Sequence, residues 1–101
     1  MKFFNKLSRS VKGRVAVITG AGSGMGEATA KVFAGEGVKV IATDVNFSEV
    51  ERVAEEIHSM DGECVPYSLD VTDNASIEEC IKSTINTYSA LDFVINNAGI
   101  S

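Results

Sequence analysis

Short apolar runs alternate along this chain with longer segments of mixed polarity. The apolar runs cover residues 14–19, 39–43, 64–69 and 93–96, which are lengths typical of β-strands. The longer segments place apolar side chains three and four positions apart, the spacing of a helix with one buried face. The pattern therefore predicts strands over the four runs and helices over residues 24–36, 48–60 and 74–89.

Strands that alternate with helices favour a parallel sheet joined by right-handed crossovers. The first strand contains the continuous apolar run 15–18, as expected when both faces of a sheet are covered. Pro66 has no backbone N–H to donate, which places the third strand at an edge of the sheet. We therefore expect the strand order 3-2-1-4, with the first two helices on one face and the third on the other. The fourth strand is then an open edge.

Residue types also predict helix ends and buried faces. Ser48 is expected to cap the second helix and Asp73 the third, because short polar side chains accept hydrogen bonds from free helical N–H groups. Gly35 and Gly37 are expected to end the first helix. The side chains expected to face the sheet are Ala28, Val32 and Phe33 on the first helix, Val50, Val53, Ala54 and Ile57 on the second, and Ile77, Ile81 and Ile85 on the third.

The charge of the chain is unevenly distributed around a net value of −5. Residues 1–14 contain basic side chains and no acid, so the rest of the chain is strongly acidic. An acidic body does not suit a nucleic-acid partner, because that affinity depends on neutralising phosphates. We interpret residues 1–13 as a basic lead-in and residues 14–101 as one domain, since a chain of 101 residues holds at most one.

The spacing of the cysteines and the length of the apolar runs indicate in which cellular compartment the protein is expected. Cys64 and Cys80 form neither a C-x-x-C pair nor a metal-ligand spacing, so we expect buried thiols in a reducing cytoplasm rather than a disulfide. The apolar runs are too short to cross a bilayer. Apolar side chains within residues 3–11 share one helical face, and we favour packing on the body over a targeting or membrane-surface role. We expect no metal and no membrane partner.

The most informative motif, residues 19–26, reads T-G-A-G-S-G-M-G between the first strand and the first helix. Gly20 lies where the chain turns sharply, and a positive φ is cheap only for glycine. Gly24 lets the backbone approach a pyrophosphate, and Gly26 lets the helix pack against the sheet. A helix N-terminus with free N–H groups binds anions, and a dinucleotide is the natural ligand of such a turn. The candidate phosphate-binding residues are Gly20, Ser23, Gly24, Met25 and Gly26.

Asp44 ends the second strand and is the candidate ribose-binding residue. A carboxylate at this position accepts hydrogen bonds from the adenosine ribose hydroxyls of NAD and repels the 2′-phosphate of NADP. The neighbouring residues, Ser23, Thr43, Val45 and Asn46, offer no cation for that phosphate. The sequence therefore predicts NAD in preference to NADP.

Two further groups follow strands at the same edge of the sheet. Asp70 and Val71 come after the third strand, where the carboxylate suits the adenine amino group and the valine an apolar contact. The N-N-A-G sequence, residues 96–99, closes the fourth strand, where small residues let a ligand lie close to the backbone. This segment adds Asn97, Ala98 and Gly99 to the candidate cofactor-binding residues.

Together these motifs resemble the short-chain dehydrogenase/reductase family, and the resemblance covers residues 12–101. The pattern is T-G-x-x-x-G-x-G followed by N-N-A-G, not the strict G-x-G-x-x-G of other dinucleotide-binding proteins. The resemblance implies a Rossmann-type doubly wound sheet, of which these residues form a part with three helices. It also implies hydride transfer between a nicotinamide cofactor and a small carbonyl or alcohol substrate, and a full-length form that is a homo-oligomer.

The chain departs from that family in one respect. The family's catalytic Ser, Tyr and Lys lie beyond N-N-A-G, and no Y-x-x-x-K occurs, because Val71 and Asp92 stand four residues after Tyr67 and Tyr88. We therefore assign no catalytic residue and expect the N-terminal cofactor-binding half of a longer enzyme. Two other interpretations remain: a stand-alone, non-catalytic NAD-binding module, and a methyltransferase that binds S-adenosylmethionine through the glycine-rich turn.

Overall fold

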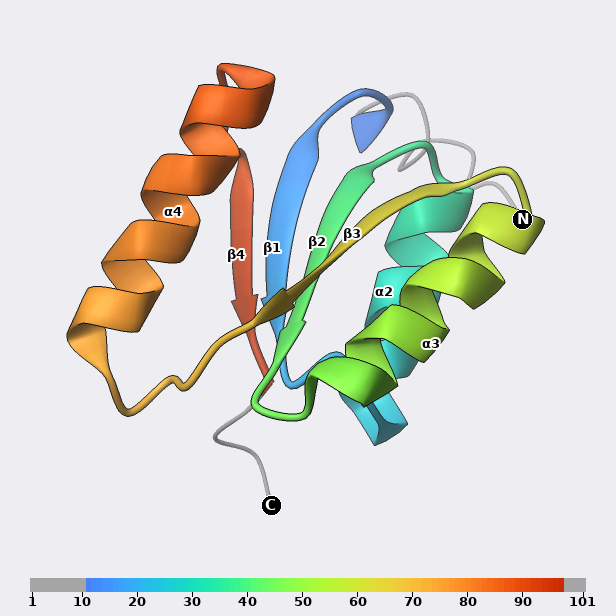
Figure 1. The fold of residues 1–101 in the computed structure, drawn as a ribbon. Coiled ribbons are helices and arrows are strands. Elements are labelled where there is room, and N and C mark those ends of the chain that lie inside the picture. The colour runs from blue at the N-terminus through green and yellow to red at the C-terminus, as the bar shows by residue number, and fades with distance from the viewer. Residues whose placement is uncertain (1–10, 98–101) are drawn as a thin grey trace.

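The structure is a computed structural model and describes residues 11–97. Strands and helices alternate along this part of the chain, as the hydrophobic pattern predicts (Figure 1). The elements are β1 (Val15–Thr19), α2 (Gly24–Gly35), β2 (Lys39–Asp44), α3 (Phe47–Ser59), β3 (Glu63–Ser68), α4 (Asn74–Tyr88) and β4 (Phe93–Asn96).

The strands form one parallel sheet in the order β3-β2-β1-β4. The predicted strand order is therefore confirmed. Pro66 lies on β3 opposite Ala42 of β2, and β3 is an edge strand, where a residue without an N–H is tolerated. Within the described residues β4 forms the other edge, as expected. The carboxyl ends of all strands meet at one edge of the sheet, which is where ligands bind in folds of this kind.

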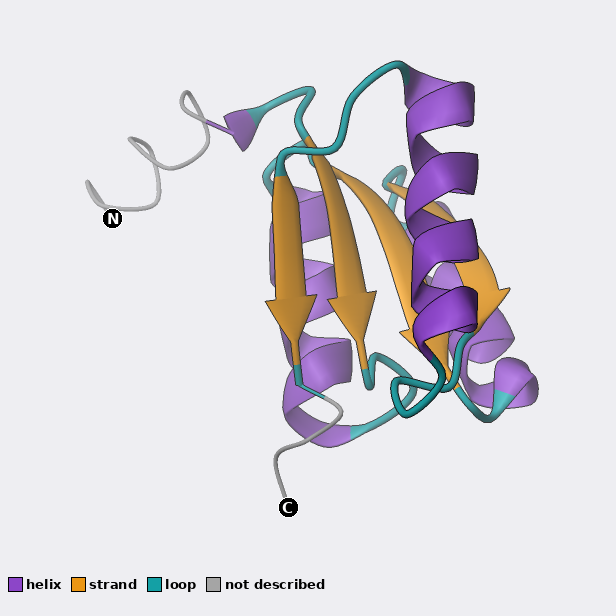
Figure 2. Cartoon of the chain, turned by 90° about the vertical axis from the view of Figure 1, so that its left-hand side faces the viewer, coloured by secondary structure: helices purple, strands orange, loops and turns teal. Residues whose placement is uncertain are grey.

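Helices cover both faces of the sheet. Figures 1 and 2 show α2 and α3 on one face and α4 on the other, as predicted. Successive β1 residues point to opposite faces: Ala16 and Ile18 join the core cluster under α2 and α3, whereas Val15 and Val17 join the cluster under α4. Burial on both faces explains why β1 reads as an unbroken apolar run.

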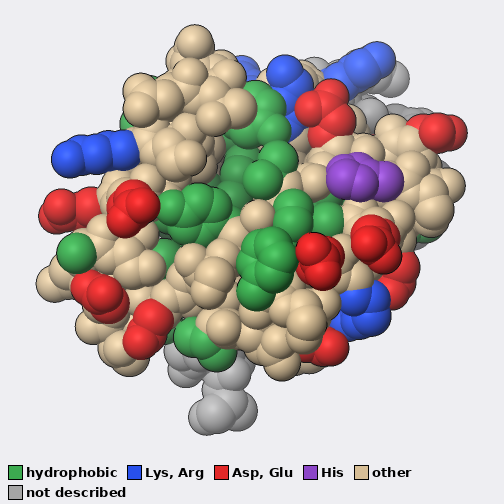
Figure 3. Space-filling model, in the orientation of Figure 1, with side chains coloured by type: hydrophobic (Ala, Val, Ile, Leu, Met, Phe, Trp, Pro, Cys, Tyr) green, Lys and Arg blue, Asp and Glu red, His purple; other side chains and the backbone are tan. Residues whose placement is uncertain are grey.

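The α4 face is covered less completely than the other. Within residues 11–97, α4 is the only helix on that face. Val65 of β3 and Val94 of β4 are 40% and 57% exposed, on the two edge strands. Figure 3 shows hydrophobic side chains gathered in a band between α4 and β3, with acidic side chains on both sides. The second face of the sheet is thus only partly buried.

Two of the predicted helix faces are only partly right, since Phe33 and Ile77 pack against the core clusters as expected but other predicted residues do not. On α2 the buried residues are the small ones, Gly26, Ala30 and Ala34, while Ala28 and Val32 are exposed. On α4 the buried residues are Cys80 and Thr84, and Ile85 is 46% exposed. Only the α3 face is fully confirmed, with four buried side chains: Val50, Val53, Ala54 and Ile57.

Two of the three predicted helix ends are confirmed. Asp73 caps α4 by accepting a hydrogen bond from the N–H of Ala75. Gly37 has a positive φ of 87° just after α2, as a helix-ending glycine should. The predicted Ser48 cap is wrong, because α3 begins at Phe47 with Asn46 at the N-cap position and the Ser48 hydroxyl donates to Asn46 Oδ1.

Cys64 and Cys80 are buried free thiols, as expected, and they belong to the two different core clusters. Val11, within the predicted basic lead-in, is buried in the cluster under α2 and α3. The rest of that lead-in, residues 1–10, lies outside the described residues. Of the helices that the structure describes, none combines the length and apolar character needed to cross a membrane.

Candidate functional site

The glycine-rich turn connects β1 to the N-terminus of α2. Gly20 has a φ of 63°, which confirms the predicted left-handed turn. The turn is tied to β2 by a hydrogen bond of 2.9 Å from the N–H of Ala21 to the carbonyl of Thr43. Ser23 is the N-cap residue, but its side chain makes no capping hydrogen bond to the helix. The N-terminus of α2 therefore keeps its free N–H groups and partial positive charge for a ligand.

A cavity of about 320 Å³ opens at this helix end. It brings together residues from three parts of the chain: the glycine-rich turn, the end of β2 and the end of β4. Positions 24 and 25 contribute open surface, since a Cβ at Gly24 would meet nothing within 4 Å and Met25 is 69% exposed. The lining residues are Gly20, Ser23, Gly24, Met25, Gly26, Asp44 and Asn97, and each is a predicted cofactor-binding residue.

Asp44 is held against the turn. Its Oδ2 accepts a hydrogen bond of 3.1 Å from the N–H of Gly22, and its Oδ1 accepts one of 3.1 Å from the N–H of Asn46. A carboxylate oxygen accepts more than one hydrogen bond, so both oxygens can still accept from a ligand hydroxyl. The carboxylate is thus fixed in place in the wall of the cavity.

Asp70 and Val71 lie at the same edge of the sheet but not in the wall of the cavity. The N–H of Leu69 donates to the carbonyl of Asp44, which brings this segment beside β2. Asp70 Oδ1 accepts hydrogen bonds from the hydroxyl and the N–H of Thr72, and these bonds lower the pKa of the carboxyl. Val71 packs against the core cluster under α4. Their contact with adenine stays a prediction.

The ends of β1 and β4 are joined by Thr19. Its hydroxyl donates to Asn96 Oδ1 at 2.7 Å and accepts from the N–H of Asn97 at 3.0 Å. Asn97 Nδ2 is buried and has no hydrogen-bond partner among the described residues. A buried donor without a partner is costly, so an acceptor supplied by a ligand in this cavity would satisfy it. Ala98 and Gly99 lie outside the described residues.

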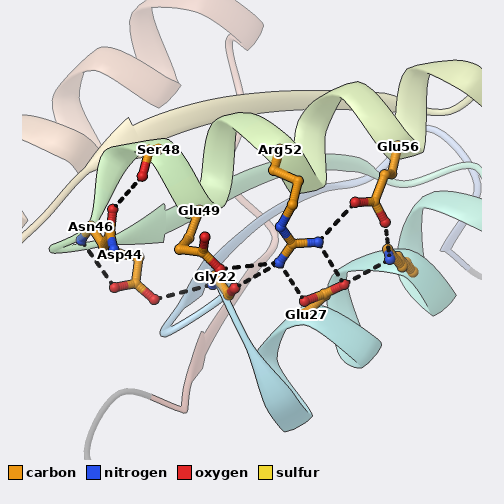
Figure 4. A network of polar contacts seen from close by, with 9 residues as sticks. Gly22, Glu27, Asp44, Asn46, Ser48, Glu49, Arg52 and Glu56 are labelled. Carbon is orange, nitrogen blue, oxygen red and sulfur yellow. Dashed lines mark hydrogen bonds and ion pairs between the residues drawn. The ribbon is translucent and has the colours of Figure 1, made fainter.

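Sequence reasoning missed a cluster of charged side chains behind the turn, which we call the Arg52 cluster (Figure 4). Its centre is the guanidinium of Arg52 on α3, which donates to the carbonyl of Gly22 and to three carboxylates. Lys31 on α2 bonds two of the same carboxylates. The members are Glu27, Lys31, Glu49, Arg52 and Glu56. The helical spacings of the Arg52 pairs within α3 were visible in the sequence, but the contacts with α2 and the turn were not.

The charged groups of the Arg52 cluster shift one another's pKa values. Hydrogen bonds from Arg52 and then Lys31 lower the pKa of Glu27 from 4.5 to about 2. Glu27 and Glu56 together raise the pKa of Arg52, and Lys31 and Arg52 lower that of Glu56. Glu27, Arg52 and Glu56 therefore stay charged at neutral pH. Within residues 11–97, no group of three or more His, Cys, Asp or Glu side chains is placed to hold a metal ion.

Comparison with known proteins gives the family. The family model described as short chain dehydrogenase matches residues 14–101, so this chain belongs to that family. A 3-oxoacyl-(acyl-carrier-protein) reductase of Thermotoga maritima is 40% identical over 91 residues, which are 90% of this chain and 37% of the relative. A cyclohexanol dehydrogenase of Acinetobacter is 33% identical over 94 residues, covering 93% of this chain and 38% of the relative.

Solved structures agree with this assignment. A hydroxysteroid dehydrogenase from Escherichia coli superposes with a TM-score of 0.83 and 29% identity over 85% of this chain and 37% of its own. A short-chain dehydrogenase/reductase from Burkholderia phymatum, solved with NAD, superposes with a TM-score of 0.79 and 29% identity over 82% of this chain and 30% of its own. The Rossmann-type fold is thereby confirmed. The chain spans between 30% and 38% of the length of these proteins.

Proposed function

We propose that this chain forms the NAD(H)-binding portion of an oxidoreductase that transfers hydride between a nicotinamide cofactor and a carbonyl or alcohol substrate. The observation that carries the proposal is the cavity at the N-terminus of α2, which has the Asp44 carboxylate in its wall. A helix N-terminus suits the pyrophosphate, and a carboxylate at the end of the neighbouring strand suits the ribose diol. The structure of a family member from Burkholderia phymatum in complex with NAD supports the same cofactor class.

Each side of the cavity has a role in this proposal. Gly24 lets the pyrophosphate approach the backbone, and the N–H groups of Ser23 and Met25 are its donors. Gly20 and Gly26 allow the sharp turn and the close helix packing that bring these groups together. Asp44 accepts from the adenosine ribose hydroxyls, which favours NAD over NADP. The buried Asn97 Nδ2 supplies a donor to the cofactor or to a segment that packs beside it. When bound, the nicotinamide ring accepts or gives the hydride.

The proposal assigns no catalytic residue to residues 1–101, because they contain no Y-x-x-x-K. We propose that the proton donor and the substrate pocket lie in a part of the protein beyond this sequence. The named relatives act on chemically different compounds, so the substrate stays open at the level of a carbonyl or alcohol. The two buried free thiols support the further proposal of a reducing cytoplasmic location.

Calorimetric titration of the purified protein with NADH, NADPH and S-adenosylmethionine tests the cofactor. We expect saturable binding of NADH, weaker binding of NADPH and none of S-adenosylmethionine. Equal affinities for NADH and NADPH would remove the role given to Asp44. Preferential binding of S-adenosylmethionine would replace the oxidoreductase proposal with a methyltransferase.

The intact mass of the native protein, captured from its source with an antibody to residues 1–101, tests the oxidoreductase proposal. A mass more than twice the 10.7 kDa of this chain places these residues in a full dehydrogenase. Native mass spectrometry of the same sample tests the homo-oligomer expected for that form. A mass near 10.7 kDa would contradict hydride transfer by this molecule and leave a stand-alone NAD-binding module.

A further inference from the structure

We propose that Arg52 is a positioning residue for the glycine-rich turn, which it holds in its cofactor-binding shape through the peptide groups of Gly22. This inference rests on the proposed function, because it concerns how the same turn is kept ready for a dinucleotide. Arg52 lies on α3, thirty positions after Gly22, and it is not in the wall of the cavity. It therefore acts through the turn rather than on the ligand.

Gly22 is held from two sides. Its N–H donates to Asp44 Oδ2 at 3.1 Å, and its carbonyl accepts from Arg52 Nη2 at 3.1 Å. Figure 4 shows the carboxylate and the guanidinium reaching Gly22 from two different elements. Because the peptide groups on both sides of its Cα are fixed, the turn between β1 and α2 has little freedom to rotate.

Gly22 is also closely packed by its neighbours. A Cβ at this position would lie 2.8 Å from Asp44 Oδ2 and 2.8 Å from the Cβ of Glu49. The turn is therefore packed between the ribose-binding carboxylate and the first turn of α3. A shift of Gly22 in either direction would disturb the position of Asp44.

The guanidinium of Arg52 is itself firmly held. It donates to both carboxylate oxygens of Glu27, at 2.9 and 3.2 Å, and to Glu56 Oε2 at 2.8 Å. Glu27 lies in the first turn of α2, so one planar group bonds both the turn and the helix start. These are the two elements whose N–H groups are expected to face the pyrophosphate. Arg52 thus sets the position of the turn relative to the end of the helix.

Lys31 provides a matched control inside the same cluster. It bonds Glu27 Oε2 at 2.7 Å and Glu56 Oε1 at 2.7 Å, but it makes no bond to the turn. Lys31→Gln removes a positive charge from Glu27 and Glu56, which are two of the three carboxylates that Arg52→Gln affects. A difference in cofactor affinity between the two variants therefore reports the contacts that Arg52 alone makes, which are those with the Gly22 carbonyl and Glu49.

The test is calorimetric titration of the full chain and its variants with NADH and with ADP-ribose. We expect Arg52→Gln to weaken the binding of both ligands about tenfold, whereas Lys31→Gln changes it less than twofold. Arg52→Lys should lie between, because a single ammonium group cannot span Glu27 and the Gly22 carbonyl as a guanidinium does. In combination with Asp44→Asn, the effect of Arg52→Gln should be smaller than it is alone, since both residues act on Gly22.

The outcomes separate this inference from the proposed function. Absence of NADH binding by the unmodified chain contradicts the proposed function itself. If the unmodified chain binds NADH and Arg52→Gln binds it equally well, the positioning role is wrong. The role is also wrong if Lys31→Gln loses as much affinity, or if Arg52→Gln weakens only NADPH, which would make Arg52 a phosphate ligand. If Arg52→Gln does not fold, Arg52→Lys decides by the same comparison with Lys31→Gln.

Discussion

A Cβ atom on Gly26 would overlap the carbonyl oxygen of Gly20. The first turn of α2 thus lies directly against the turn that leaves β1, with no room for a side chain between them. Gly20 has a φ of 63°, so both ends of this contact depend on glycine. The close approach is what brings the N-terminus of α2 to the floor of the cavity.

Gly26→Ala is therefore expected to destabilise the protein and to abolish NADH binding. Forcing a methyl group into a filled contact typically costs about 1–3 kcal/mol, and here it also displaces the turn. Urea unfolding, monitored by circular dichroism, measures the loss of stability, and titration with NADH measures the loss of binding.

Gly35→Ala is the matched control, since it lies on the same helix and a Cβ there would meet nothing within 4 Å. We expect stability unchanged or raised by up to about 1 kcal/mol, because alanine favours a helix more than glycine does, and unchanged NADH binding. Equal loss of binding in the two variants would show that helix stability rather than the contact with Gly20 is responsible.

Asp44→Ala is expected to narrow the difference in affinity between NADH and NADPH. The variant loses the acceptor for the ribose hydroxyls and also the repulsion of a 2′-phosphate. NADH should bind about tenfold more weakly, corresponding to about 1.4 kcal/mol, while NADPH should bind as before or more tightly. Fluorescence titration of both cofactors at one ionic strength measures the ratio.

Asp61→Asn serves as the control for charge. Asp61 follows α3 and precedes β3, at the opposite end of the strands from the cavity. Its removal changes the net charge of the protein by the same amount as Asp44→Ala. The NADH-to-NADPH ratio should stay at the value of the unmodified chain, and an equal change in both variants would indicate a general charge effect.

Glu27 should contribute to the loss of stability in acid. Its pKa is lowered from 4.5 to about 2 by Arg52 and Lys31, so its contribution is complete above pH 4.5 and disappears as the pH falls towards 2. Glu27→Gln should be less stable than the unmodified chain at pH 7, and its stability should fall less between pH 5 and about 2.5. Urea unfolding at several pH values measures both slopes.

Glu55→Gln is the corresponding control, because Glu55 is exposed on α3 and is not a member of the Arg52 cluster. It should show the same acid slope as the unmodified chain. A slope for Glu27→Gln that equals the slope for Glu55→Gln would contradict the assignment of this acid transition to Glu27.

The strand order could be predicted from the sequence, because a few residues strongly restrict where each strand can lie in the sheet. Pro66 requires an edge, and the unbroken apolar run of β1 requires a strand covered on both faces. The residues of the cavity wall could also be predicted from the sequence. Glycines that follow one strand and an acid that follows the next meet at the carboxyl edge of a parallel sheet. These features depend on local chain geometry and on the handedness of the crossovers.

The complete buried faces of α2 and α4 could not be predicted from the sequence, because close packing rather than side-chain hydrophobicity decides which residues are buried there. Ala30 and Ala34 are buried on α2 since small side chains let the helix lie near the sheet, and the larger Val32 is left 45% exposed. On α4 the buried Thr84 hydroxyl is satisfied by the carbonyl of Cys80, so a polar residue faces the core without penalty. A pattern of apolar positions cannot detect either arrangement.

The two cysteines allow the faces of the sheet to be compared. Cys64 belongs to the cluster under α2 and α3, and Cys80 lies on α4. Burial raises the pKa of Cys64 from 9.0 to about 11 and also raises the pKa of Cys80. Because the thiolate is the reactive form, both should react with a disulfide reagent at pH 8 far more slowly than free cysteine, and at the normal rate after unfolding in guanidinium.

Cys80 should nevertheless react before Cys64 in mild urea. Its exposed fraction is 1%, against 4% for Cys64, so exposure in the folded state predicts the opposite order. However, α4 is the only helix on its face within residues 11–97, and a singly covered face should open at a lower free energy than one under two packed helices. The single-thiol variants Cys64→Ala and Cys80→Ala, labelled in parallel and followed by mass spectrometry, give the two rates. Faster labelling of Cys64 would show that the face under α2 and α3 opens first.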